Sequence, residues 1–109
     1  MPSTFETTWT AIGRALHQGA VVRNWGAARG YTGGKFKIVD VDRTSVTVSG
    51  GEMSMARRVS KGDFEKVAGV WEEYIAGNYP RSKMTNLSQN TTYILSILHL
   101  VTDAQGWAS

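Results

Sequence analysis

The chain has 109 residues, 41% of them hydrophobic, with no cysteine and a formal net charge of +3. This composition indicates one globular domain, residues 1–109, and excludes disorder, disulfides and thiolate metal sites. No run approaches the ~18 apolar residues of a membrane span and no secretion signal is evident, so we expect a cytoplasmic protein without membrane contact.

A helix is predicted over residues 4–18. The run STFE at residues 3–6 is a capping-box pattern. The apolar residues that follow are spaced four, three and four apart, which places them on one helical face: Phe5, Trp9, Ile12 and Leu16. Gly19 supplies a left-handed stop.

Strands with short turns follow the helix. The alternating or apolar runs are residues 20–23, 35–42, 45–49 and, less regularly, 53–59. The alternation changes phase at Ile38 and Val39, which predicts a bulge there. Turns are expected at residues 42–44 and at Gly50-Gly51. Together these segments predict a three- to four-stranded antiparallel meander.

Two helices are predicted after the meander. The first begins with a capping box at Ser60, with Val59 and Phe64 as its hydrophobic staple, and ends at Gly77. Its expected buried stripe consists of Phe64, Val67, Trp71, Tyr74 and Ile75. A polar connector over residues 78–87 leads to a second helix over residues 89–101. The predicted fold class is therefore α+β.

The helix over residues 89–101 is apolar around nearly its whole circumference. Leu95 and Leu100 lie off the main stripe, so two arrangements remain open. Either the helix is a central pillar between the sheet and the other helices, flanked by Trp9 and Trp71, or its outer face forms a homodimer. A small domain with one sheet rarely buries a helix on every side, but the pillar is favoured because Trp9 and Trp71 could flank the helix.

The stretch NWGAARGYTGGKF, residues 24–36, is rich in glycine and is predicted to be a mobile loop from Asn24 to Gly34. It does not match a phosphate-binding loop, because Phe36 follows Lys35 where Ser or Thr is required. Nucleic-acid binding is one interpretation, since basic side chains neutralise phosphates and aromatic rings stack on bases. A solvated hairpin loop without a ligand is an equally weighted alternative.

The basic residues gather in the middle of the chain, which favours the nucleic-acid interpretation. Residues 20–61 hold eight Lys or Arg against three acidic residues, whereas residues 62–109 hold three against five. The predicted nucleic-acid-binding residues are Arg23, Trp25, Arg29, Tyr31, Lys35, Lys37, Arg43, Arg57, Arg58 and Lys61.

Catalytic chemistry is not expected. The two histidines, His17 and His99, are too few for a transition-metal site without cysteine. Asp40 and Asp42 are more typical of a strand end and turn than of a Mg²⁺ site. No nucleophile elbow is present. We therefore predict neither catalytic residues, metal nor cofactor.

Residues 59–101 resemble the small α+β accessory modules appended to HNH-type restriction endonucleases. The shared features are a basic strand end, a helix opening on Asp-Phe-Glu and a last helix that starts Asn-x-x-Tyr-Ile. No HNH motif is present, so the resemblance implies a DNA-sensing accessory without catalysis. A lone domain of this size also resembles the product of a mobile gene cassette or a phage gene.

The leading hypothesis is a non-enzymatic nucleic-acid-binding module that uses the basic meander and the glycine-rich loop. The alternative is a protein-interaction module from a mobile-element or defence context, in which the helix over residues 89–101 forms a homodimer. A continuous basic face favours the first hypothesis, and an exposed apolar patch favours the second.

Overall fold

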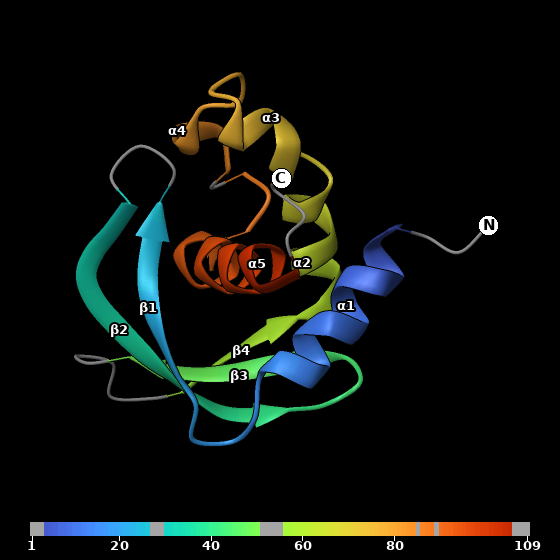
Figure 1. Ribbon diagram of the computed structural model, residues 1–109, viewed down its shortest axis with the longest axis vertical. Helices are drawn as coiled ribbons and strands as arrows, with labels where there is room; N and C mark the ends of the chain where they lie inside the picture. The colour runs from blue at the N-terminus through green and yellow to red at the C-terminus, as the bar shows by residue number, and fades with distance from the viewer. Residues whose placement is uncertain (1–3, 27–29, 51–55, 85, 89, 106–109) are drawn as a thin grey trace.

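The computed structural model describes residues 4–26, 30–50, 56–84, 86–88 and 90–105. An N-terminal helix is followed by a four-stranded antiparallel sheet and then by helices (Figure 1). The strands are neighbours in chain order, so the sheet is a meander. This arrangement confirms the predicted α+β fold class.

The first helix, α1 (Thr4–Ala15), ends three residues before the predicted boundary. Its predicted apolar face is correct, because Phe5, Ile12 and Leu16 are buried. The helix ends early because the chain turns to pair with the sheet: the Gly19 amide donates to the Ile38 carbonyl at 2.7 Å. Gly19 has the predicted left-handed conformation, with a φ of 91°, but it lies four residues beyond the end of α1 and turns the chain into the first strand, so its assignment as the helix stop was wrong.

The sheet consists of β1 (Val21–Gly26), β2 (Gly30–Val41), β3 (Ser45–Gly50) and β4 (Arg57–Ser60). The register of β2 against β3 shifts between Ile38 and Asp40, which confirms the predicted bulge. Residues 51–55, which include Gly51 of the expected turn and the start of the expected fourth strand, lie outside the described residues.

The prediction of a loop from Asn24 to Gly34 is wrong for the described residues of this stretch, and its mobility stays a prediction. Both strands continue into this stretch and Trp25 pairs with Tyr31, so the described part of it is hairpin ladder. Between the Arg23–Lys35 and Trp25–Tyr31 pairs, β2 contains more residues than β1, and the excess is accommodated as an irregularity. Gly33, with a φ of 93°, adopts the left-handed conformation that this irregularity requires.

The helix predicted from Ser60 to Gly77 is divided into α2 (Lys61–Ala68) and α3 (Trp71–Ile75). Its start is correct: the Ser60 hydroxyl accepts from the Asp63 amide at 3.2 Å. The division arises at Gly69 and Val70, where the Val70 amide donates to the Val67 carbonyl three residues earlier and tightens the turn.

The break changes the phase of the predicted buried stripe. Phe64 and Val67 of α2 and Tyr74 of α3 are buried, Trp71 is half-buried, and Ile75 is exposed. The assignment of Ile75 to the buried face was wrong because the helical period does not continue across the break. The predicted connector contains a short helix, α4 (Arg81–Met84), whose Met84 side chain is fully buried.

The last helix, α5 (Thr91–Gln105), lies in the concavity of the sheet with α1 and α2 on its other side (Figure 1). Its side chains make up much of the core: Ile94, Leu95, Ile97, Leu98 and Val101 are all buried. The predicted pillar is therefore correct. Of the two leucines that lie off the main stripe, Leu95 is buried and Leu100 is 39% exposed, and the homodimer stays a prediction. Among the described helices, none is both long and apolar enough to cross a membrane.

Candidate nucleic-acid interface

The outer face of the sheet, directed away from α5, carries three of the predicted cationic residues side by side. Arg23 pairs with Lys35 and Val21 pairs with Lys37, so these side chains share one face. Val22, Phe36 and Ile38 alternate with them and are buried on the opposite face. We call the cluster of Arg23, Lys35 and Lys37 the basic face.

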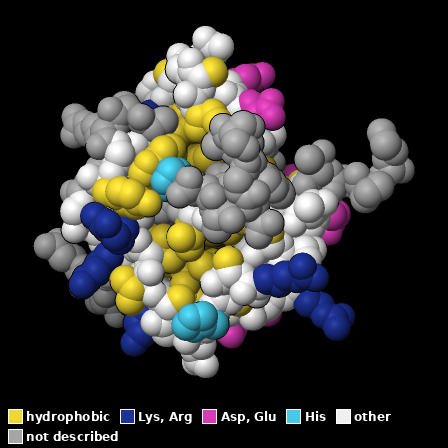
Figure 2. All heavy atoms as spheres, in the orientation of Figure 1, with side chains coloured by type: hydrophobic (Ala, Val, Ile, Leu, Met, Phe, Trp, Pro, Cys, Tyr) yellow, Lys and Arg dark blue, Asp and Glu magenta, His cyan; other side chains and the backbone are white. Residues whose placement is uncertain are grey.

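The basic face is compact and exposed. Directly opposed Cα atoms in an antiparallel ladder are about 5 Å apart, and alternate residues along one strand are about 7 Å apart. All three side chains are exposed, and none forms an ion pair with another described residue. Figure 2 shows Lys and Arg along the flank formed by β1 and β2, a second group of Lys and Arg beside α1, and Asp and Glu over α3 and beside α1.

The predicted aromatic residue Trp25 faces α5 instead of the outer surface. Its ring stacks on His99 with centroids 3.9 Å apart and planes inclined by 4°. Trp71 and Tyr74 lie at 5.8 and 6.4 Å from the same ring. The Trp25 amide donates to the Ser96 hydroxyl at 2.9 Å, so both side chain and backbone of Trp25 are attached to the helical layer.

Tyr31, the other predicted aromatic residue, lies between the basic face and α5. The Arg23 guanidinium is 4.4 Å from the centroid of its ring, which is a cation–π contact. The His99 ring approaches Tyr31 at 5.7 Å with an interplanar angle of 70°. Arg23, Tyr31, His99 and Trp25 thus form a continuous series of contacts from the outer face to the interior.

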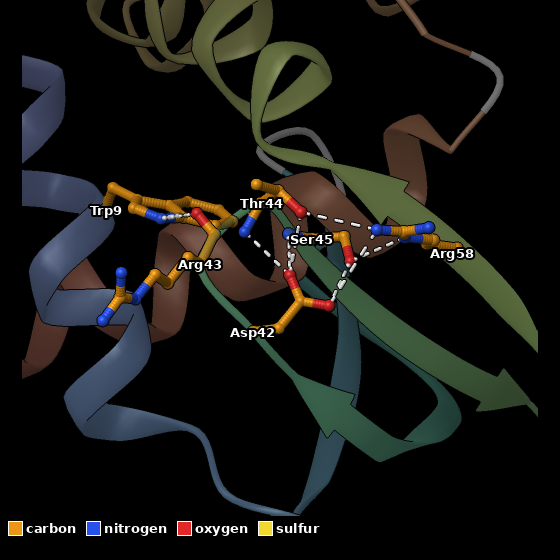
Figure 3. Close-up of polar contacts among 6 residues, drawn as sticks. All are labelled: Trp9, Asp42, Arg43, Thr44, Ser45 and Arg58. Atoms are coloured by element: carbon orange, nitrogen blue, oxygen red, sulfur yellow. Dashed lines mark hydrogen bonds and ion pairs between the residues drawn. The ribbon is translucent and has the colours of Figure 1, made fainter.

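Arg58 lies in β4, and its side chain reaches the turn between β2 and β3, where it takes part in a local polar network (Figure 3). Its Nε donates to the Ser45 hydroxyl at 2.9 Å, and its Nη2 is 4.0 Å from Asp42 Oδ2. Asp42 Oδ1 accepts from the amides of Thr44 and Ser45 at 2.7 and 2.8 Å. The hydrogen bonds from Thr44, and those from Ser45, lower the pKa of the Asp42 carboxyl. The Arg58 side chain is therefore held against the turn between β2 and β3, beside the negative charge of Asp42.

Two further predicted cations contact the helical layer. Arg57 directs its Nη1 to the Asn90 side-chain oxygen at 3.4 Å. Lys61 Nζ lies 2.8 Å from a carboxylate oxygen of Glu6, so its charge is paired with α1. Neither residue extends the basic face.

The remaining predicted residues are Arg43 and Arg29. Arg43 is exposed in the turn after β2, and its carbonyl accepts from the Trp9 indole nitrogen at 3.1 Å (Figure 3). This bond attaches the turn to α1 and leaves the guanidinium directed away from Asp42. Arg29 lies outside the described residues.

Three residues around the hairpin were missed by the sequence interpretation: Asn24, Ser96 and His99. Ser96 and His99 are three residues apart in an otherwise apolar helix, a spacing that indicates one shared face and was the available signal. Asn24 Oδ1 is buried without a hydrogen-bond partner among the described residues. Its amide nitrogen would lie 2.5 Å from a Cβ at Gly34, so glycine leaves room for it. No pattern in the sequence indicated that contact.

The described residues contain no group of three or more His, Asp or Glu side chains arranged to hold a metal ion. His99 is stacked among aromatic rings, and His17 Nδ1 lies 3.2 Å from the Gln18 carbonyl. Among the described residues, the candidate site is the exposed, charged surface of the basic face. The absence of enzymatic activity stays a prediction.

No protein-family model, curated protein sequence or solved structure matches the chain. The resemblance of residues 59–101 to accessory modules of HNH-type endonucleases accordingly stays a prediction from the sequence.

Proposed function

We propose that this chain is a non-enzymatic nucleic-acid-binding module whose contact surface is the basic face of β1 and β2. The observation that supports the proposal is the strand register, which places Arg23, Lys35 and Lys37 together on the exposed outer face. No described carboxylate pairs with any of the three. Unpaired, closely spaced cations bind phosphates and release condensed counterions, which is a favourable entropic change.

The proposal is narrower than the set of residues predicted from the sequence. Arg58 and Lys61 are engaged with Asp42 and Glu6, and Arg57 points toward α5. We therefore assign the phosphate contacts to the hairpin.

A charge-matched pair of double variants tests this assignment. Lys35→Ala with Lys37→Ala removes two charges from the basic face. Lys66→Ala with Lys83→Ala removes two exposed charges from α2 and α4 and serves as the control. Affinity for labelled oligonucleotides is measured by fluorescence anisotropy over a range of salt concentrations.

We expect the hairpin variant to flatten the plot of log affinity against log salt by about 1.8 for a duplex, because two phosphate contacts are lost. The control should leave the slope of the wild type unchanged. Equal effects of the two variants, or no binding by wild-type protein at tens of micromolar, would contradict the proposal.

An exposed apolar strip supports the second candidate, a protein-interaction module. Hydrophobic side chains run across the face of the molecule where α5 ends (Figure 2). Val21 and Leu100 are among the large apolar side chains that are exposed. This candidate predicts self-association or partner binding that is insensitive to the Lys35 and Lys37 substitutions, and sedimentation velocity at increasing protein concentration detects the homodimer.

A further inference from the structure

The aromatic rings of the hairpin are already engaged by neighbouring side chains. The face of Trp25 that stacks on His99 is covered, because the two rings are parallel at 3.9 Å. Trp71 and Tyr74 approach the same indole from α3. A nucleobase that stacked on Trp25 would have to displace a packed side chain.

The outer ring of the hairpin, Tyr31, is also occupied. Although Tyr31 is 48% exposed, the Arg23 guanidinium lies over its ring at 4.4 Å. The edge contact with His99 fixes the orientation of the ring. Among the described residues of β1 and β2, no exposed aromatic ring is left without a side chain against it.

The rest of the outer face, as far as the structure describes it, carries small and aliphatic groups and one anion, Asp40, which is exposed and pairs with Thr47 on the other side of the bulge. Lys37 pairs with Ser49 on β3, and Val21 is its partner on β1. Such a surface can neutralise phosphates, but it lacks the stacking surfaces from which single-strand-binding proteins obtain affinity.

The spacing of the three charges fits a ligand of high charge density. By the geometry of a β-ladder, the Cα atom of Lys35 lies about 5 Å from that of Arg23 and about 7 Å from that of Lys37, and the diagonal from Arg23 to Lys37 is about 8 Å. A duplex carries one negative charge per ~1.7 Å of its axis, and both of its strands contribute to the field at one short patch. A flexible single strand has to be ordered before it presents the same density of charge.

We propose, on the basis of the proposed function, that the basic face binds duplex nucleic acid through the phosphate backbone, without stacking on bases. Arg23 has two roles in this arrangement: it covers Tyr31 and it adds a charge beside Lys35. The recognition is of shape and charge and carries little base preference, because phosphate contacts are common to every sequence.

The test compares ligands and ring variants in one binding assay. Wild-type protein is titrated with a labelled single strand, the matching DNA duplex and the matching RNA duplex. Tyr31→Leu removes the aromatic ring but retains an apolar side chain, and Lys35→Ala with Lys37→Ala removes charge. Circular dichroism establishes that each variant is folded.

We expect tighter binding of at least one duplex than of the single strand, and no more than about a twofold change on Tyr31→Leu. Tighter binding of the DNA duplex, the RNA duplex or both than of the single strand supports the inference, and the comparison of the two duplexes identifies the source of the phosphates. The comparison of wild-type affinities does not depend on any variant folding.

Tighter binding of the single strand, with a loss of roughly 5- to 150-fold on Tyr31→Leu, would overturn the inference because it indicates base stacking. The proposed function would survive that result. Absence of binding to all three ligands would instead defeat the proposed function, so the two failures are distinguishable.

Discussion

Replacing Ser96 with alanine tests how firmly β1 is attached to α5. The Ser96 hydroxyl accepts from the Trp25 amide at 2.9 Å and donates to the Thr92 carbonyl at 2.8 Å. Ser96 is 2% exposed, so water does not readily replace the lost oxygen. Ser96→Ala therefore leaves the partly buried Trp25 amide without its acceptor.

The expected cost follows from these contacts. A buried donor that loses its acceptor costs about 1–3 kcal/mol, and the higher helix propensity of alanine offsets up to about 0.5 kcal/mol. We expect the free energy of unfolding to fall by about 1–2 kcal/mol.

Thr10→Ala is the matched control. The Thr10 hydroxyl also donates to a carbonyl four residues earlier, that of Glu6, at 2.9 Å. The Thr10 side chain is exposed and its described hydrogen bond stays within α1, so its removal should change the free energy of unfolding by less than about 0.5 kcal/mol.

Urea denaturation followed by circular dichroism gives both free energies, and the m-value should stay constant if only stability changes. Hydrogen exchange of the Trp25 amide reports on the bond itself and should accelerate in Ser96→Ala alone. Equal stabilities of the Ser96 and Thr10 variants, together with unchanged exchange at Trp25, would refute the reasoning.

Three other substitutions test the turns and the aromatic cluster. Hydrogen bonds from Thr44 and Ser45 lower the pKa of Asp42 in the folded protein. The Asp42 carboxylate therefore stabilises the fold fully above its unfolded-state pKa, and this stabilisation is lost as pH falls through the folded-state pKa. Wild-type stability should thus fall more steeply than that of Asp42→Asn from about pH 4 downward, and parallel urea-stability profiles would contradict this. Gly33→Ala should lower the free energy of unfolding by about 1–2 kcal/mol, because the residue has a φ of 93°. Gly13→Ala, at an open position in α1, should raise it by about 0.5–1 kcal/mol. Urea midpoints that move in the same direction for both variants would contradict this contrast. Trp71→Ala should lower the free energy of unfolding by about 2 kcal/mol, because the ring is half-buried against two aromatic neighbours. This loss is below the 3–5 kcal/mol that is typical of a fully buried tryptophan. A change within about 0.5 kcal/mol in urea denaturation would show that these contacts contribute little.

The sequence predicted those parts of the fold in which one local pattern determines burial. Alternation in Val46 and Val48 identified β3, and both side chains are fully buried. The change of phase at Ile38 identified the bulge, because a single inserted residue reverses the faces of a strand.

The failures occurred where local preference and tertiary contact differ. Glycine disfavours a strand on average, so the glycine-rich stretch indicated a loop. Pairing with β1 and the attachment of Trp25 to Ser96 and His99 maintain the hairpin in spite of that preference. Likewise, Ile75 was assigned to a buried face because a continuous helical period was assumed beyond Val70.

The candidate site was predictable in position but not in composition. Strand alternation correctly placed Lys35 and Lys37 on one solvent-facing side. It could not show that Arg58 is engaged with Asp42, or that Lys61 is paired with α1, because those contacts join residues distant in sequence.

The internal contacts of the hairpin bear directly on how the basic face would bind. A ligand that orders a mobile loop loses affinity to the entropy of ordering, whereas a preorganised surface avoids most of that cost. Here the backbone beneath Lys35 is paired with Arg23, and β1 is attached to α5 through Trp25. Only the long side chains remain to be ordered. Binding to a duplex would accordingly depend on salt far more than on base sequence. Ser96→Ala, which loosens the hairpin, would weaken this binding. It would leave the salt slope unchanged, because the number of phosphate contacts stays the same.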